Sequence, residues 1–199
     1  MPGITHWQHP SWFSFFPANA SPPSVLAELV SAGLGVQGML WSTSPAATEI
    51  ESHVLDWLVD LMDLPSEWKT TSLGGGVLQM SASDSTHTSI VVARHQAMKR
   101  GVNPTAMVAY ASTQTHSSIQ KGATVAGYRH IRLIPVDDKQ AMDISALRTA
   151  LASDKAEGLV PVFVAATLGT TGTTAVDPIR PIGEICQEEN LWLHVDAAY

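Results

Sequence analysis

Three short polar segments carry the side chains best suited to chemistry, and each follows an apolar run of the sequence. Asp196 follows LWLHV, His116 lies in STQTHSS after AMVAY, and Thr171 lies in GTTGTT after LVPVFVAATL. A carboxylate at the end of a buried strand needs a hydrogen-bonding or cationic partner, and a cationic ligand would satisfy Asp196. His116 on its own is more often a structural residue than a catalytic one.

A fourth candidate segment, SLGGGVLQMSAS, ends in small residues just before a helical pattern. Glycines let the backbone approach a ligand, and free N–H groups at a helix start attract an anion such as phosphate. The expected contact positions are Ser81, Ala82 and Ser83. For this stretch alone, an ordinary glycine turn with a serine cap is the slightly better explanation.

Several other kinds of site are excluded by their patterns. GLGVQG at 33–38 matches G-x-G-x-x-G but follows a helical pattern, and no acidic residue lies at the distance that a nicotinamide site needs. The sequence has neither a P-loop nor the G-x-S-x-G of a serine hydrolase. The histidine pairs His6/His9 and His87/His95 lack further ligands at usual spacings, so we expect no metal site.

Charge and cysteine content narrow the class of partner. The net charge of −7 and the pI of about 5.5 argue against nucleic acid or an anionic membrane. The one cysteine, Cys186, fits a reducing compartment and is expected in the core. No signal peptide and no apolar run of the ~20 residues that span a membrane are found. These features predict a soluble cytoplasmic protein.

Alternating strands and helices must position the polar segments. Residues 1–21 read as an aromatic connector, and 22–199 as the first part of a larger domain. The expected helices begin near residues 22, 45, 84, 116, 144 and 177. Asp177 is the expected N-cap of the last helix, with Pro178 at its first position. The expected strands are 106–110, 130–136, 159–168 and 191–197.

The character of these strands predicts the fold class. Strands that are apolar on both faces and separated by helices imply an α/β fold, with a mainly parallel sheet and helices on both faces. In such sheets ligands bind beyond the carboxyl ends of the strands. The polar segments that hold His116, Thr171 and Asp196 all fall at that edge.

Taken together and in order, the segments resemble the pyridoxal-phosphate-dependent group II decarboxylases, specifically the aromatic-L-amino-acid decarboxylases. The resemblance covers nearly the whole chain: THWQHPSWFSFFPA, SPAATEIESHVLDWL, GGGVLQMSAS, THSS, ATLGTTGTTAVDPI and LWLHVDAAY. It implies part of a PLP-dependent fold type I (aspartate aminotransferase-like) large domain. It also implies decarboxylation of aromatic L-amino acids of the Trp, Tyr, Phe or DOPA class to amines, through a PLP Schiff base.

The resemblance implies a role for each cofactor-site residue. Asp196 pairs with the protonated pyridine nitrogen and keeps the ring an effective electron sink. His116 stacks on the ring and helps to orient the substrate, while Thr171 lies near ring and substrate. Ala82 and Ser83 hold the phosphate at the helix start.

The aromatic connector resembles the substrate-pocket wall of the family. Trp7, Phe15, Phe16 and Pro17 would favour an apolar aromatic substrate over glutamate, although an aromatic cluster is also ordinary core. Many relatives carry Tyr at Phe15 and Thr at Ala18. The loss of both hydroxyls favours tryptophan, phenylalanine or tyrosine over a catechol.

Two further roles come from the resemblance. Asp177 would support the loop that carries Thr171, although a plain N-cap role explains it at least as well. The family acts as a homodimer whose pocket borrows residues from the neighbouring subunit, here the Val36–Met39 region. Gln37 and Met39 stand where relatives often have larger apolar residues, which leaves the substrate open.

The family's Schiff-base lysine lies after the aspartate of HVDAAY, next to a histidine. All five lysines of this chain precede Asp196. We therefore expect a fragment of a longer enzyme, truncated at both ends and with little activity alone. The alternatives are an aromatic aldehyde synthase, another PLP decarboxylase of this fold such as a glutamate or cysteine-sulfinate enzyme, and a non-catalytic truncated piece.

Overall fold

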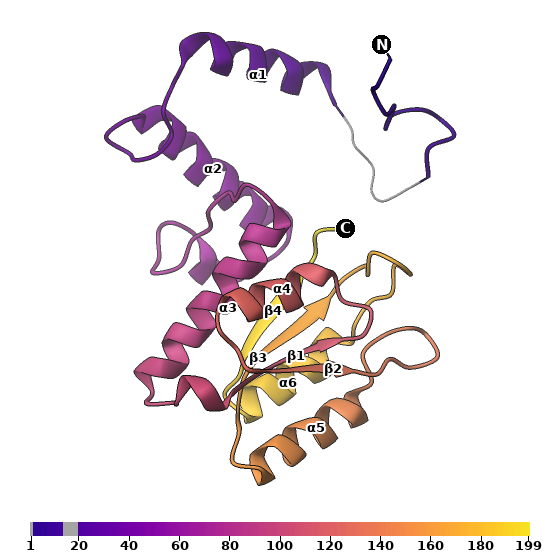
Figure 1. The fold of residues 1–199 in the computed structure, drawn as a ribbon. Coiled ribbons are helices and arrows are strands. Elements are labelled where there is room, and N and C mark those ends of the chain that lie inside the picture. The colour runs from indigo at the N-terminus through magenta and orange to yellow at the C-terminus, as the bar shows by residue number, and fades with distance from the viewer. Residues whose placement is uncertain (1, 14–19) are drawn as a thin grey trace. The chain divides into compact units, whose positions relative to one another are not determined.

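The computed structural model describes residues 2–13 and 20–199 (Figure 1). The chain forms two compact units, Met1–Gln79 and Met80–Tyr199. The predicted division into a connector at 1–21 and a domain from residue 22 stays a prediction.

The first unit contains helices α1 (Pro22–Leu34) and α2 (Pro45–Leu61) and the short 3-10 helix η1 (Ser66–Trp68). The Ser21 hydroxyl accepts a hydrogen bond from the Ser24 N–H and so caps α1. Pro45 occupies the first position of α2, as its start signal predicted. Most apolar side chains of the two helices are exposed, and Val59 is the buried one among the described residues of this unit.

The second unit alternates strands and helices after a long first helix. Its elements are α3 (Ala82–Lys99), η2 (Pro104–Ala106), β1 (Met107–Ser112), α4 (Ser117–Val125), β2 (His130–Ile134), α5 (Ile144–Ala156), β3 (Val160–Thr167), α6 (Ile179–Glu188) and β4 (Trp192–Asp196). Each predicted strand and helix of this part is present, with ends shifted by a few residues.

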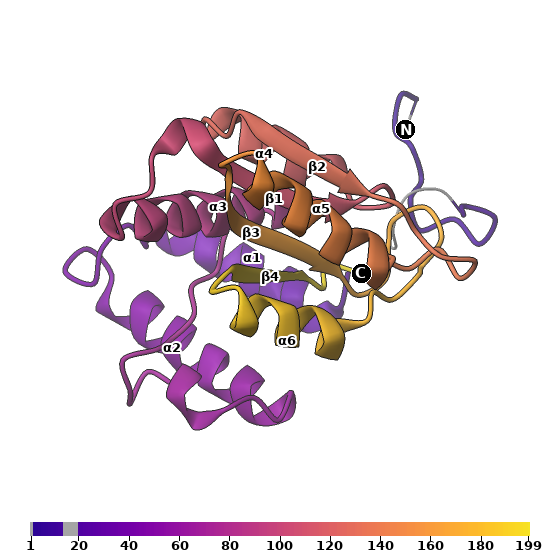
Figure 2. The same ribbon diagram turned by 90° about the horizontal axis from the view of Figure 1, so that it is seen from below.

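The four strands form one parallel sheet in the order β2-β1-β3-β4, as Figure 2 shows. Every connection between paired strands passes through a helix, because parallel strands need a crossover. The predicted mainly parallel sheet is confirmed.

Side chains that alternate along the central strands fill two separate cores. On one face Ala109 and Phe163 pack with α3 and α4, and on the other Tyr110 and Val164 pack with α5 and α6. The two pairs of helices accordingly lie on opposite sides of the strands (Figure 1). Cys186 is buried in the second core, as predicted, and burial raises the pKa of its thiol to about 12.

Strand β4 corrects one expectation. LWLHV reads as a buried strand, yet Trp192 and Val195 are 37% and 38% exposed. The physical reason is that β4 pairs only with β3 in the described sheet and is therefore an edge strand. Asp196, at its end, is half-buried rather than buried.

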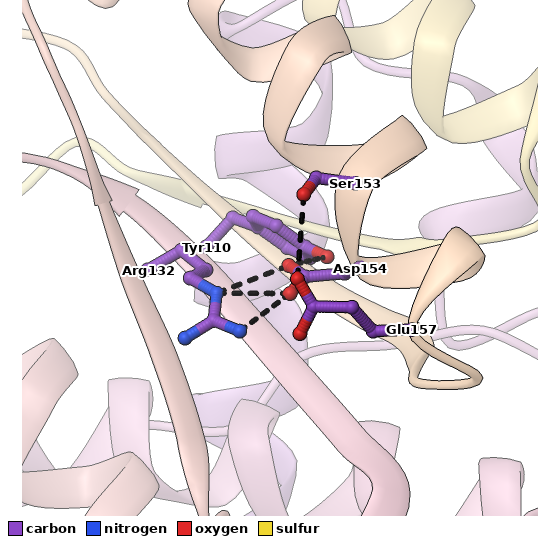
Figure 3. Close-up of polar contacts among 5 residues, drawn as sticks. All are labelled: Tyr110, Arg132, Ser153, Asp154 and Glu157. Carbon is purple, nitrogen blue, oxygen red and sulfur yellow. Dashed lines mark hydrogen bonds and ion pairs between the residues drawn. The ribbon is translucent and has the colours of Figure 1, made fainter.

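A polar network lies between the sheet and α5 (Figure 3). Asp154 of α5 accepts hydrogen bonds from Tyr110 Oη at 2.7 Å and from Arg132 Nε at 3.0 and 3.1 Å. Tyr110 and Arg132 are directly paired in register on β1 and β2. The same figure shows the helix-surface contact of the Ser153 hydroxyl with Glu157 at 3.5 Å.

Candidate functional site

The carboxyl ends of β1, β3 and β4 bring polar side chains together at one edge of the sheet. Thr167, the last residue of β3, is in register with Asp196, the last residue of β4. The Thr115 hydroxyl, in the loop after β1, lies 3.4 Å from the Thr167 hydroxyl. The predicted convergence of the polar segments at this edge is therefore confirmed.

His116 forms the N-cap of α4. Its Nδ1 accepts the Ser118 backbone N–H at 3.2 Å and lies 2.9 Å from the Ser118 hydroxyl. A ring nitrogen that accepts a backbone N–H carries no proton, so a ring proton in this arrangement lies on Nε2. The imidazole is thus anchored through one nitrogen while the residue stays exposed.

The start of α3 contains the predicted phosphate contacts. The Ser81 hydroxyl accepts the Asp84 N–H at 3.2 Å and donates to the Asp84 carboxylate at 2.9 Å. Ala82 and Ser83 occupy the exposed first turn. The N–H groups of a first turn have no partner within the helix, so this end is suited to an anion.

Close packing of α3 against α4 brings Ser83 and His116 together. A Cβ on Gly122 of α4 would lie 3.0 Å from Ile90 Cδ1 of α3, so glycine permits this approach. Both helices begin at one hollow of about 200 Å³, lined by Ser83, Asp84, His87, His116, Ser117, Ser118, Lys121, Gly122 and Val125. Asp196 and Thr171 are not among its lining residues.

Asp177 closes the loop that carries Thr171. One carboxylate oxygen accepts the Thr167 N–H at 2.8 Å, and the other accepts the Met142 N–H at 2.8 Å. Burial raises the pKa of Asp177 although these two hydrogen bonds oppose it. The predicted N-cap role is wrong: Pro178 is the N-cap and α6 begins at Ile179, because the Asp177 side chain is engaged elsewhere.

Thr171 itself lies in an exposed turn at the tip of this loop. Below it, the Thr170 hydroxyl meets the Thr173 hydroxyl at 2.7 Å and accepts the Ala175 N–H at 3.0 Å. At the base, Gly169 has a φ of 86°, and a Cβ there would lie 2.9 Å from the Tyr199 ring. The loop is therefore held from inside, which leaves the Thr171 side chain outside that network.

The Asp196 carboxylate accepts the Ala198 backbone N–H at 3.2 Å, and its backbone carbonyl accepts the Leu168 N–H at 2.8 Å. None of the ion pairs found among residues 2–13 and 20–199 includes Asp196. The Asp196 carboxylate thus keeps unused hydrogen-bond acceptor capacity at the edge where the three polar segments meet.

Sequence reasoning missed His194, two residues before Asp196 on the same face of β4. Its Nε2 lies 3.3 Å from the Thr86 hydroxyl of α3, and its ring stacks on Phe163 at a centroid distance of 5.9 Å. Burial lowers the pKa of His194, with Asp196 opposing the shift. The period-two alternation from Asp196 is the signal that marks this position.

The predicted substrate-wall residues fall in the first unit of the chain. Trp7 lines a hollow formed by residues 4–10, and its ring centroid lies 5.6 Å from that of Trp12. The predictions for Phe15, Phe16 and Pro17, and for Ala18, fall outside the described residues.

Among residues 2–13 and 20–199, no cluster of three or more histidine, cysteine or acidic side chains could hold a metal ion. No helix in that part of the chain is both long and apolar enough to cross a membrane.

Comparison with known proteins gives the family. A family model described as the pyridoxal-dependent decarboxylase conserved domain matches residues 1–199. The aromatic-L-amino-acid decarboxylase of Sus scrofa shares 43% sequence identity with this chain; the alignment covers the whole chain and 43% of the relative. The phenylacetaldehyde synthase of Arabidopsis thaliana also shares 43% identity, over the whole chain and 42% of the relative. The chain thus spans about two fifths of the length of these relatives.

A solved structure agrees with the sequence comparison. The tryptophan decarboxylase of Catharanthus roseus, in complex with L-tryptophan, superposes with a TM-score of 0.95 at 41% identity, over all of this chain and 44% of that one. The parallel sheet with its flanking helices is thus the arrangement of a pyridoxal-phosphate-dependent decarboxylase domain, in part. The chain belongs to the pyridoxal-dependent decarboxylase family.

Proposed function

We propose that the protein containing this chain uses pyridoxal 5'-phosphate to decarboxylate aromatic L-amino acids to amines. The observation that carries the proposal is Asp196, a carboxylate without a cationic partner among the described residues, at the strand edge where His116 and Thr167 also lie. Family membership and the aromatic decarboxylases among its relatives support it. Because the chain spans about two fifths of those relatives, the proposal concerns the longer protein.

The residues present fit this cofactor. Asp196 has an acceptor to spare for a protonated ring nitrogen, and the first turn of α3 at Ala82 and Ser83 offers unpaired N–H groups to a phosphate. His116, held by its Nδ1, offers a ring face for stacking. When bound, the pyridinium ring supplies an electron sink for the electrons released as CO₂ departs. Thr171 would orient the substrate, and Asp177 would hold its loop.

The substrate and assembly belong to the same proposal. Trp7, Phe15, Phe16 and Pro17 would form the pocket wall for an aromatic side chain. A homodimer is supported by exposed apolar side chains in the Val36–Met39 region, where Val36 and Met39 are 52% and 72% exposed. A cytoplasmic location is supported by the single cysteine.

Cofactor binding by the longer protein tests the assignment of Asp196. Titration calorimetry with pyridoxal 5'-phosphate should show that Asp196→Asn weakens binding at least about tenfold, because a charge-assisted hydrogen bond is lost. Asp138→Asn, a change in a surface turn, is the matched control and should leave the affinity unchanged. Equal affinities for wild type and Asp196→Asn would refute the assignment.

A second candidate function is that of an aromatic aldehyde synthase, which couples decarboxylation to oxidative deamination: O₂ is the oxidant, and aldehyde, CO₂, ammonia and H₂O₂ are the products. The observation favouring it is the 43% identity to a phenylacetaldehyde synthase, the same value as for the decarboxylase of Sus scrofa. Product analysis of the longer protein with L-phenylalanine separates the two functions. Phenylethylamine supports the decarboxylase, whereas phenylacetaldehyde with ammonia supports the synthase.

A further inference from the structure

Strand β4 and helix α3 are joined by a pair of polar contacts that the cofactor contacts do not include. Trp192, His194 and Asp196 alternate onto the same face of β4. Trp192 Nε1 donates to the Ser89 hydroxyl of α3 at 2.9 Å, and His194 Nε2 lies 3.3 Å from the Thr86 hydroxyl.

The two contacts have a regular register. Moving two residues along β4 toward its carboxyl end corresponds to moving from Ser89 to Thr86, about one turn toward the start of α3. One further step of the same kind leads from His194 to Asp196 on the strand and from Thr86 to Ala82 and Ser83 on the helix. The contacts therefore link the carboxylate of Asp196 to the anion-binding end of α3.

Apolar packing alone would not determine this register. Ile90, Ala93 and Ala97 hold α3 on the sheet through contacts that are non-directional. A hydrogen bond has a narrow range of length and angle, so it restricts sliding of the helix along the strand. Thr86 is 2% exposed, which shields its hydroxyl from competing water.

The His194 ring is itself held in place. It stacks on Phe163 of β3 with an interplanar angle of 24°. Burial lowers its pKa, so the ring is neutral at pH 7 and has one donor nitrogen and one acceptor nitrogen. Either tautomer can form the contact, because a threonine hydroxyl both donates and accepts.

We propose that His194 and Thr86 are positioning residues whose hydrogen bond sets the separation between the start of α3 and the Asp196 carboxylate. The inference rests on the proposed function, in which the helix start binds a phosphate and Asp196 binds a ring nitrogen. A ligand that uses both points requires the correct separation, whereas a ligand that uses the helix start alone does not.

The test compares a two-point probe with a one-point probe on the longer protein in its cofactor-free form. Pyridoxamine 5'-phosphate carries both the ring nitrogen and the phosphate and needs no lysine linkage, while inorganic phosphate carries only the anion. Thr86→Val should weaken pyridoxamine phosphate about fivefold, the equivalent of one net hydrogen bond, and leave phosphate affinity unchanged. Calorimetry or ³¹P NMR measures both affinities.

Matched variants separate positioning from general damage to the helix. Thr88→Val makes the same change on the exposed side of α3 and should alter neither affinity. Thr86→Ser keeps the hydroxyl and should restore pyridoxamine phosphate binding. If circular dichroism shows that Thr86→Val is unfolded, His194→Gln and His194→Phe replace it, with only the phenylalanine variant expected to lose affinity.

Three outcomes overturn the inference. Equal pyridoxamine phosphate affinity in Thr86→Val and Thr88→Val would overturn the positioning role while leaving the proposed function intact. Equal losses for pyridoxamine phosphate and phosphate would show a general disturbance of the helix start rather than a changed separation. Absence of pyridoxamine phosphate binding by the wild-type longer protein would remove the proposed cofactor site and the inference with it.

Discussion

Two aspartates of the same sheet-and-helix unit differ in how fully their charge is satisfied. Asp154 is 2% exposed and accepts hydrogen bonds from both Arg132 and Tyr110. Burial opposes its ionisation, but these hydrogen bonds outweigh burial and hold the pKa of Asp154 below its usual value. Asp196 is half-buried at the strand edge, and its carboxylate accepts the Ala198 backbone N–H.

The difference separates a structural carboxylate from one available to a ligand. Asp154 has a cation and a hydroxyl as partners within the fold, so its lone pairs are used. Its hydrogen bonds therefore contribute to the stability of the folded state. Asp196 keeps unused acceptor capacity at the edge where ligands of parallel sheets bind. A carboxylate at this edge therefore points to a ligand when the fold leaves part of its acceptor capacity unused.

The largest expected effect is on the free energy of unfolding, when Asp154 and Asp196 are each replaced in separate variants. Asp154→Ala should lower it by about 2–3 kcal/mol, because Arg132 and Tyr110 lose their acceptor. This is less than the roughly 3–5 kcal/mol of a fully buried pair. The reason is that the Arg132 side chain is 37% exposed and rehydrates. Asp196→Ala should change the value by no more than about 0.5 kcal/mol. Urea unfolding measures both changes. Equal losses for the two variants would contradict the distinction between a structural Asp154 and a ligand-accessible Asp196.

A smaller effect concerns two buried tyrosines. Tyr110→Phe removes a 2.7 Å hydrogen bond to Asp154 and should lower the free energy of unfolding by about 1.5 kcal/mol. Tyr128→Phe is the matched control, because the Tyr128 hydroxyl is buried without a hydrogen-bond partner among the described residues. Its removal should be neutral or stabilising by up to about 1 kcal/mol. Thermal unfolding distinguishes the pair, and a larger loss for Tyr128→Phe would contradict the Asp154 network.

The smallest effect concerns pH and His194. Burial lowers the pKa of His194 below its usual 6.5, so the unfolded chain binds the proton more tightly. The stability that this ring contributes is present above about pH 6.5 and is lost as pH falls through the folded-state pKa. Wild type should therefore lose more stability than His194→Gln between about pH 7.5 and about pH 5. Asp196→Asn should lose still more stability than wild type over this pH range, because Asp196 opposes the lowering of the His194 pKa. Identical pH profiles of stability for wild type and His194→Gln would argue against a buried neutral ring.

Much of the fold could be predicted because its signals are local. Apolar runs between helical patterns marked the four strands, and Pro22 and Pro45 marked helix starts that the structure contains. The polar segments after β1, β3 and β4 were correctly expected at one edge, because all strands of a parallel sheet end on the same side.

The errors and omissions concern contacts between distant parts of the chain. Asp177 precedes a helix and so resembles an N-cap, yet its carboxylate accepts the N–H groups of Thr167 and Met142. The LWLHV run is apolar, yet its exposure depends on how many neighbours β4 has in the sheet. Asp154 falls on the same helix face as Leu147 and Leu151, so periodicity could have marked it as buried but not named its partners.

The sequence by itself determined the class of fold, the family and the residues that reach the edge of the sheet. Periodicity, capping signals and motif order are written into neighbouring residues and need no knowledge of distant ones. Only the tertiary structure decided which carboxylate is saturated, which glycine lets α3 approach α4, and that Thr86 meets His194. Those outcomes depend on the directions of side chains that are far apart in the sequence, 22 residues for Arg132 and Asp154 and 108 for Thr86 and His194.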